Sequence, residues 1–176
     1  THAAISTGQA DSKFGFSMDA ARTAIDRLAG SRTLNLVGLH AHVGSQLMDL
    51  EPFRAAVREL ATLGDFPIYN LGGGLAAAYK VDQHPPDIAR YVAAIVEALH
   101  SELGEDKRLL LEPGRALVAN STVTLYTVQT IKHNVSTWVA VDGGMSDNLR
   151  PMMYGARYEA LVANRALAPA ETRCHL

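Results

Sequence analysis

Two kinds of apolar segment alternate along the first two thirds of the chain, and this alternation constrains the fold most. Short runs rich in Leu, Ile and Val predict strands, and longer segments with apolar residues every three or four positions predict helices. The expected strands are 34–42, 66–71 and 109–112, and the expected helices are 18–29, 51–63 and 88–103. Ser17 and Asp49 are the expected N-caps of the first two helices. Strands separated by helices of this length pair in parallel, which predicts an α/β fold.

The pattern changes after Ala116. Residues 122–131 alternate and are rich in Val and Thr, residues 137–141 are again strand-like, and no long helical pattern returns. We therefore expect two parts. Residues 1–116 would form a partial (β/α)8 barrel of the TIM type that carries a binding site, and residues 117–176 a β-rich segment leading into a second domain.

Composition excludes several classes of function. Of the 176 residues 48% are hydrophobic, so the chain can build a core. The 16 basic and 18 acidic residues give a net charge of −2, which argues against nucleic acid as a partner. One cysteine excludes an internal disulfide framework, and no apolar run reaches the roughly 18–20 residues that a bilayer requires. We expect a soluble, cytoplasmic protein without a membrane or nucleic-acid partner.

Each expected strand ends in a polar or glycine-rich cluster. The clusters are His-Val-Gly-Ser-Gln at 42–46, Gly-Gly-Gly at 72–74 and Glu-Pro-Gly-Arg at 112–115. Because the carboxyl ends of parallel strands open on one face, and active sites of barrels lie on that face, the three clusters predict one shared site. No group of residues has the spacing of a metal site.

The chemistry of these clusters leaves alternatives open. The glycine run is either a loop whose N–H groups bind a phosphate, with the Ser45 hydroxyl adding to it, or a flexible turn. Glu112 ends an apolar strand and needs a partner. That partner is either Arg115 or a protonated ring nitrogen of a cofactor, as in pyridoxal phosphate (PLP). His42 could lie against such a ring or be structural.

A further motif, Val-Asp-Gly-Gly-Met-Ser-Asp-Asn-Leu-Arg-Pro, occupies residues 141–151. By its chemistry it is a tight turn followed by an arginine, Arg150, that is suited to a carboxylate. Tyr154 lies four residues further on, close enough to face the same ligand. An arginine that is simply solvated is the alternative.

In this order the four motifs resemble the diaminopimelate decarboxylases, PLP-dependent enzymes of the alanine-racemase-like barrel class. Ile5–Gly8 and Lys13–Phe16 match the same family. The resemblance covers essentially the whole chain. Parts of the first three motifs also occur in ornithine and arginine decarboxylases, whereas the run ending in Arg150 is typical of the diaminopimelate branch.

The resemblance implies a role for each residue. His42 and Glu112 would be catalytic, His42 stacking on the PLP ring and Glu112 pairing with its nitrogen. The cofactor would further contact Ser45, Gly72, Gly73, Gly74, Pro113, Gly114 and Arg115. Arg115, Arg150 and Tyr154 would bind the substrate. The implied reaction removes carbon dioxide from meso-diaminopimelate to give L-lysine, and the implied assembly is a homodimer.

Two family features have no counterpart in the sequence. None of Lys13, Lys80, Lys107 and Lys132 lies in the context of the family's Schiff-base lysine, and Cys174 does not match its catalytic cysteine. We therefore expect this chain to be the central fragment of such an enzyme, without its two ends, and to be inactive alone. The alternatives are a non-catalytic binding or regulatory relative, and a decarboxylase of another basic amino acid.

Overall fold

The computed structural model describes residues 13–169 and 172–176, so the Ile5–Gly8 motif lies outside the described residues. The chain divides into two compact units. The first comprises residues up to Ala78 together with Asp82–Ala119, and the second comprises Tyr79–Val81 and Asn120–Leu176. Each unit is described by itself.

The first unit is an α/β structure with a parallel sheet, as expected. Its three strands are β1 (Gly38–His40), β2 (Ile68–Asn70) and β3 (Arg108–Leu110), and they stand in the order β1-β2-β3 with parallel pairing throughout. All three are shorter than predicted. Apolar composition marks residues that face the core, but it does not report how far main-chain pairing extends.

The helices follow the predicted boundaries closely. The three predicted ones are α1 (Met18–Ala29), α2 (Glu51–Ala61) and α3 (Ile88–Leu103), and a short helix that was not predicted, α4 (Gly114–Val118), follows β3. The Ser17 hydroxyl caps α1 by accepting the N–H of Ala20 at 3.3 Å, which confirms that prediction. The Asp49 prediction is wrong: the N-cap of α2 is Leu50, and the Asp49 carboxylate instead accepts the N–H of Glu51 at 2.9 Å.

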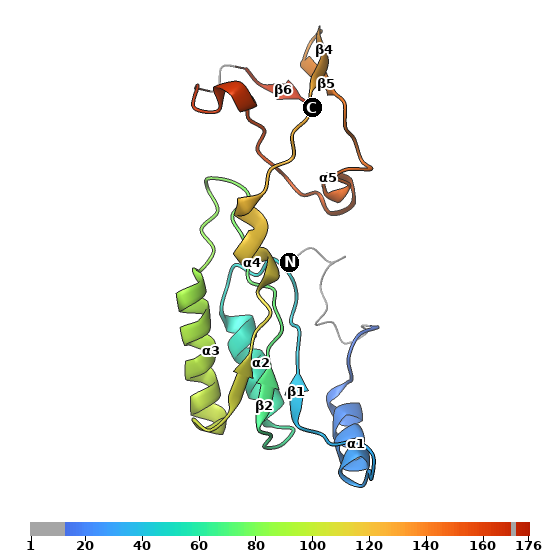
Figure 1. Cartoon of the computed structure of the whole chain (residues 1–176), viewed down its shortest axis with the longest axis vertical. Helices are drawn as coiled ribbons and strands as arrows, with labels where there is room; N and C mark the ends of the chain where they lie inside the picture. Colours follow the sequence, from blue (N-terminus) through green and yellow to red (C-terminus); the bar gives the residue numbers. More distant parts are fainter. Residues whose placement is uncertain (1–12, 170–171) are drawn as a thin grey trace. The chain divides into compact units, whose positions relative to one another are not determined.

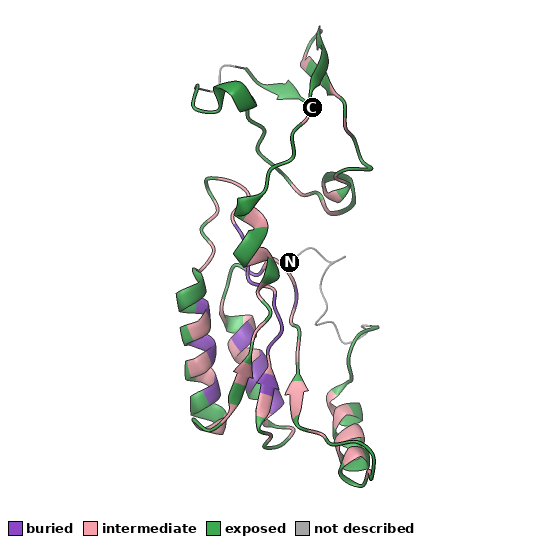
Figure 2. Cartoon of the chain, viewed as in Figure 1, coloured by how far each residue is buried: buried purple, intermediate pink, exposed green. Residues whose placement is uncertain are grey.

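The core of this unit lies between the sheet and helices α2 and α3 (Figures 1 and 2). Phe53 of α2, Tyr69 of β2, and Tyr91 and Ile95 of α3 are fully buried. The rings of Phe53 and Tyr91 meet edge to face with their centroids 4.9 Å apart. This packing fixes the strands, and thereby fixes where their carboxyl ends lie.

The second unit contains an antiparallel pair, β4 (Val128–His133) and β5 (Thr137–Val141), with β6 (Cys174–His175) parallel to β5. Short helical turns follow β5, namely α5 (Arg150–Tyr154) and the 3-10 turn Ala163–Arg165. None of its described residues is buried (Figure 2). No helix in the described parts of the chain is both long and apolar enough to cross a membrane.

Candidate functional site

The segments that follow β1, β2 and β3 are tied to one another by main-chain hydrogen bonds. The N–H of Ala41 donates to Asn70 O at 2.9 Å, and the N–H of Glu112 donates to Gly72 O at 2.8 Å. The parallel pairing therefore continues past the strand ends. The glycine segment 72–74 lies between the segments that carry the other two clusters.

Close main-chain contacts require glycine at all three positions of this segment. A Cβ on Gly72 would lie 2.7 Å from Ala41 O, one on Gly73 2.2 Å from Glu112 O, and one on Gly74 2.3 Å from Gly44 O. Gly72 and Gly74 also have φ values of +63° and +111°, where a side chain is strained. The glycine run thus allows three loops to pack at main-chain distance.

Two of the three glycine N–H groups donate within the chain. That of Gly72 donates to Asn70 Oδ1 at 2.8 Å, and that of Gly73 donates to His42 Nδ1 at 3.3 Å. The second bond holds the exposed His42 ring against the glycine segment. Because Nδ1 accepts, neutral His42 carries its proton on Nε2. Among the described residues, the N–H of Gly74 has no acceptor.

Glu112 does not pair with Arg115, the partner in the chain that the sequence suggested. Its Oε1 accepts a hydrogen bond from Asn70 Nδ2 at 2.7 Å. Arg115 Nη2 instead donates to Ser45 Oγ at 3.3 Å, although the two residues are 70 positions apart. At the edge of the sheet formed by the carboxyl ends of β1, β2 and β3, the Ser45 hydroxyl therefore meets the Arg115 guanidinium. The Glu112 carboxylate, bound by the Asn70 amide, lies at the same edge.

Gln46 is a further residue of this edge that sequence reasoning missed. Its φ of +58° makes it the one non-glycine residue with positive φ in the described chain. Its side chain bonds both main-chain groups of Ala77, donating to the carbonyl at 2.6 Å and accepting the N–H at 3.2 Å. Leu47 pairs with Leu75 alongside. These bonds offset the strained φ and fix the loop that carries Ser45.

Tyr91 lies in the core with an unsatisfied hydroxyl. The residue is fully buried, and its oxygen has no hydrogen-bond partner in the described part of the chain. Burial, with a smaller contribution from the negative charge of Glu112, raises the pKa of Tyr91 to about 12. The hydroxyl therefore stays neutral and is an orphaned polar group in the layer beneath the site.

The last two predicted site residues, Arg150 and Tyr154, belong to the second unit, in α5. The Arg150 guanidinium lies over the ring of Tyr79, 5.8 Å from its centroid. Its Nε is buried without a partner among the described residues. Arg150 is thus half-buried and stacked on an aromatic ring, which does not fit a simply solvated arginine.

The glycine motif before α5 forms the turn that the sequence predicted. Asp142 Oδ1 accepts the N–H of Thr127 at 2.7 Å, and Asp147 Oδ2 accepts the N–H of Gly144 at 2.8 Å. The hydrogen bonds from Thr127 hold the pKa of Asp142 below its ordinary value. Asp142 therefore stabilises this turn as a carboxylate.

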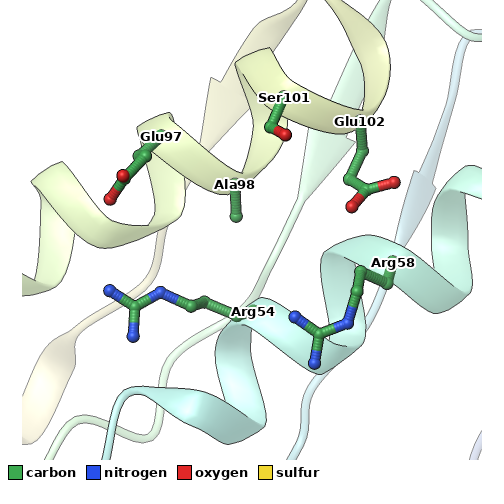
Figure 3. A pocket seen from close by; sticks show the side chains of 6 residues that line it. All are labelled: Arg54, Arg58, Glu97, Ala98, Ser101 and Glu102. Atoms are coloured by element: carbon green, nitrogen blue, oxygen red, sulfur yellow. The ribbon is translucent and has the colours of Figure 1, made fainter.

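A groove of about 310 Å³ lies between α2 and α3 (Figure 3). Arg54 and Arg58 of α2 line one wall, and Glu97 and Glu102 of α3 line the other. Arg58 forms an ion pair with Glu51 of its own helix. None of the predicted site residues lines this groove, and its opposite charges balance, so it is not the site that the motifs define.

Comparison with known proteins identifies the family. Residues 1–119 match the family described as "Pyridoxal-dependent decarboxylase, pyridoxal binding domain". The match covers more than half of the chain, so the chain belongs to the pyridoxal-dependent decarboxylases. These residues include every predicted site residue of the first unit, and pyridoxal phosphate is the cofactor of the family.

Individual relatives are named more specifically. The chain is 41% identical to diaminopimelate decarboxylase of Bacillus subtilis over 94% of its own length, and 39% identical to that of Mycobacterium tuberculosis over 94%. It spans about two fifths of these curated relatives, 42% in each case.

Solved structures agree with this placement. Diaminopimelate decarboxylase from Helicobacter pylori, complexed with L-lysine, has a TM-score of 0.85 and 33% identity, covering 97% of this chain and 43% of that one. Lysine/ornithine decarboxylase from Vibrio vulnificus, complexed with putrescine, has a TM-score of 0.73 and 26% identity, covering 84% and 42%.

Proposed function

We propose that the protein containing this chain removes carbon dioxide from the D-centre of meso-diaminopimelate and releases L-lysine. The observation that carries the proposal is the meeting of Ser45 and Arg115 on the same sheet edge as the amide-bound carboxylate of Glu112. The names of the bacterial relatives and the four ordered sequence motifs support the choice of substrate.

The donor set at this edge fits the two ends of pyridoxal phosphate. The Ser45 hydroxyl, the N–H of Gly74 and the main chain of Arg115 suit a phosphate dianion, which leaves the Arg115 guanidinium for the substrate. Gly72, Gly73, Pro113 and Gly114 shape the same edge with their main chain. Since the Gly72 and Gly73 N–H groups are already paired, we assign these two glycines to close packing rather than to direct phosphate binding.

Glu112 and His42 would contact the ring of the cofactor. The carboxylate of Glu112 would accept an N–H from the pyridine nitrogen and keep that nitrogen protonated. The His42 ring, held by Gly73, would lie against the ring face. When bound, the cofactor supplies an electron-poor ring that takes up the electron pair left as carbon dioxide departs.

Arginines would select the substrate by its carboxylates. A guanidinium binds a carboxylate through two parallel N–H donors, and Arg115 and Arg150 offer two such groups. The hydroxyl of Tyr154 would add a further contact. Meso-diaminopimelate keeps a carboxylate at the end remote from the reaction, which L-lysine and L-ornithine lack, so a second arginine favours it over both.

We further propose that the first unit is part of a (β/α)8 barrel, that residues 117–176 lead into a β-rich domain, and that the enzyme is a cytoplasmic homodimer. The 176-residue chain alone should lack decarboxylase activity. None of its four lysines matches the family's Schiff-base lysine. Lys107, which forms ion pairs with Asp65 and Asp106, precedes β3, whereas Glu112 follows β3, so the two residues lie at opposite ends of this strand.

Carbon dioxide release by the full-length gene product tests the substrate. With pyridoxal phosphate present, kcat/KM for meso-diaminopimelate should exceed that for L-lysine or L-ornithine by about a hundredfold or more, because neither competitor has the remote carboxylate that would pair with an arginine. Equal turnover of L-ornithine would refute the substrate assignment.

Substitution of Glu112 tests the role of the carboxylate. Glu112→Gln keeps the size of the side chain but removes the charge, so kcat should fall by about a hundredfold or more while the cofactor stays bound. Near-normal turnover would leave Glu112 with only its bond to Asn70.

A further inference from the structure

Asn70, the last residue of β2, connects the glycine segment to Glu112. Its Oδ1 accepts the N–H of Gly72 at 2.8 Å, and its Nδ2 donates to Glu112 Oε1 at 2.7 Å. The side chain is half-buried. Neither the predicted site nor the motif roles include this residue.

The bond from Gly72 fixes which way the Asn70 amide points. A main-chain N–H can only donate, so the amide oxygen must face Gly72 and the amide nitrogen must face Glu112. In this orientation Asn70 is a donor that a carboxylate accepts in its ionised form. The Asn70 side chain therefore fixes one oxygen of Glu112 relative to the glycine turn.

Glu112 depends on this contact for its orientation. It is exposed, and it has no ion pair with any residue that the structure describes. A glutamate without such an anchor samples several rotamers, and fixing it has an entropic cost at each binding event. With Oε1 occupied by Asn70, Oε2 is left for a second donor.

We propose that Asn70 is a positioning residue that holds Glu112 ready to accept the N–H of a protonated heterocyclic nitrogen. The inference rests on the proposed function, since that nitrogen is the cofactor's. It goes beyond that function in assigning the orientation of Glu112 to the amide of Asn70.

Asn70→Asp separates this role from local structure. An aspartate has the same shape and can still accept the N–H of Gly72, so the turn is retained. Facing Glu112, however, it presents an acceptor where the amide presented a donor. As pH falls, the two carboxylates would share a proton, and the protonated form restores a donor.

The experiment uses the full-length gene product loaded with pyridoxal phosphate that is 15N-labelled in the ring. We expect Asn70→Asp to bind the cofactor and keep its thermal midpoint, and to change the 15N resonance because repulsion between the two carboxylates displaces Glu112 from the ring nitrogen. Its kcat should fall about tenfold to a hundredfold with KM changing less than about threefold, and should recover as pH is lowered. Asn164→Asp makes the same chemical change in the exposed turn Ala163–Arg165, and should behave as wild type.

Asn70→Ser is the second variant if Asn70→Asp does not fold, because one oxygen that lies a bond closer to the main chain cannot meet both partners of the two amide atoms. It should move the 15N resonance toward the unprotonated position and lower kcat, without recovery at low pH. An unchanged 15N resonance and kcat in a folded variant overturn the inference while the proposed function stands. A wild-type protein that neither binds the cofactor nor releases carbon dioxide overturns both.

Discussion

Gly73→Ala tests whether the glycine segment exists for main-chain packing. Gly73 is buried where the segment after β2 passes Glu112, and an added Cβ would lie 2.2 Å from Glu112 O and 3.1 Å from its carbonyl carbon. Both atoms belong to the main chain, so neither can rotate away. The two segments must separate if the variant is to fold.

The size of the effect follows from this overlap. An ordinary contact needs about 1 Å more, which would stretch the adjacent bond from the Glu112 N–H to Gly72 O beyond its 2.8 Å. Overpacking costs about 1–3 kcal/mol, and a lost main-chain hydrogen bond about 1 kcal/mol. A total of about 2–4 kcal/mol corresponds to a fall in Tm of roughly 5–15 °C for a chain of this size.

Thermal unfolding followed by circular dichroism measures this shift. Gly114→Ala is the matched control, because a Cβ at Gly114 meets nothing within 4 Å and alanine favours the first turn of α4. Its Tm should equal or slightly exceed that of the wild type. If Gly73→Ala unfolded within about 1 °C of the wild type, the packing argument would be refuted.

Two further predictions follow from single groups. Tyr91→Phe removes a buried hydroxyl without a described partner, so Tm should rise by about 2–4 °C at pH 7. Because the folded pKa of Tyr91 is raised to about 12, the native state loses stability above pH 10 and the advantage of the variant should widen there; a lower Tm would contradict this. Asp142→Asn should lower Tm at pH 7, since the depressed pKa of Asp142 means that its charged form stabilises the fold. That contribution begins to be lost as pH falls below about 4, the ordinary pKa of aspartate, and is gone below the lowered folded pKa, so the Tm difference should close there; a constant difference would exclude the charge as its origin.

Helix positions could be predicted from sequence because their signals are local. The apolar spacing and the Ser17 hydroxyl bond, three residues apart, place α1 without reference to the rest of the chain. The Asp49 prediction was wrong by one residue, because the side chain of Asp49 forms a turn before the helix begins. Strand lengths were overestimated because pairing depends on segments that are 30 to 40 residues away.

The sequence motifs predict which residue types occupy the site, but not the hydrogen-bond partners that orient their side chains. Sequence alone left Glu112 with two possible partners, and neither was Asn70, which lies 42 residues away. One signal could have found it: an asparagine at a strand end, two residues before a glycine run, favours a side-chain turn that leaves its amide nitrogen for another partner. Gln46 carries no comparable signal, because its left-handed φ is set by Ala77, 31 residues away.

The glycine run shows both a local sequence signal and contacts that form only between distant segments. As a pattern it was equally consistent with a phosphate-binding loop and a flexible turn, because both need a main chain without side chains. The contacts made by Gly72 and Gly73 depend on the carbonyl groups of Ala41 and Glu112, which only the assembled sheet brings near. The same close approach places the Gly72 N–H against Asn70 and thereby turns an amide toward Glu112. The same main-chain contacts therefore determine both the packing of the glycine segment and the orientation of Glu112. A substitution that separates the segments should also free the Glu112 carboxylate from Asn70.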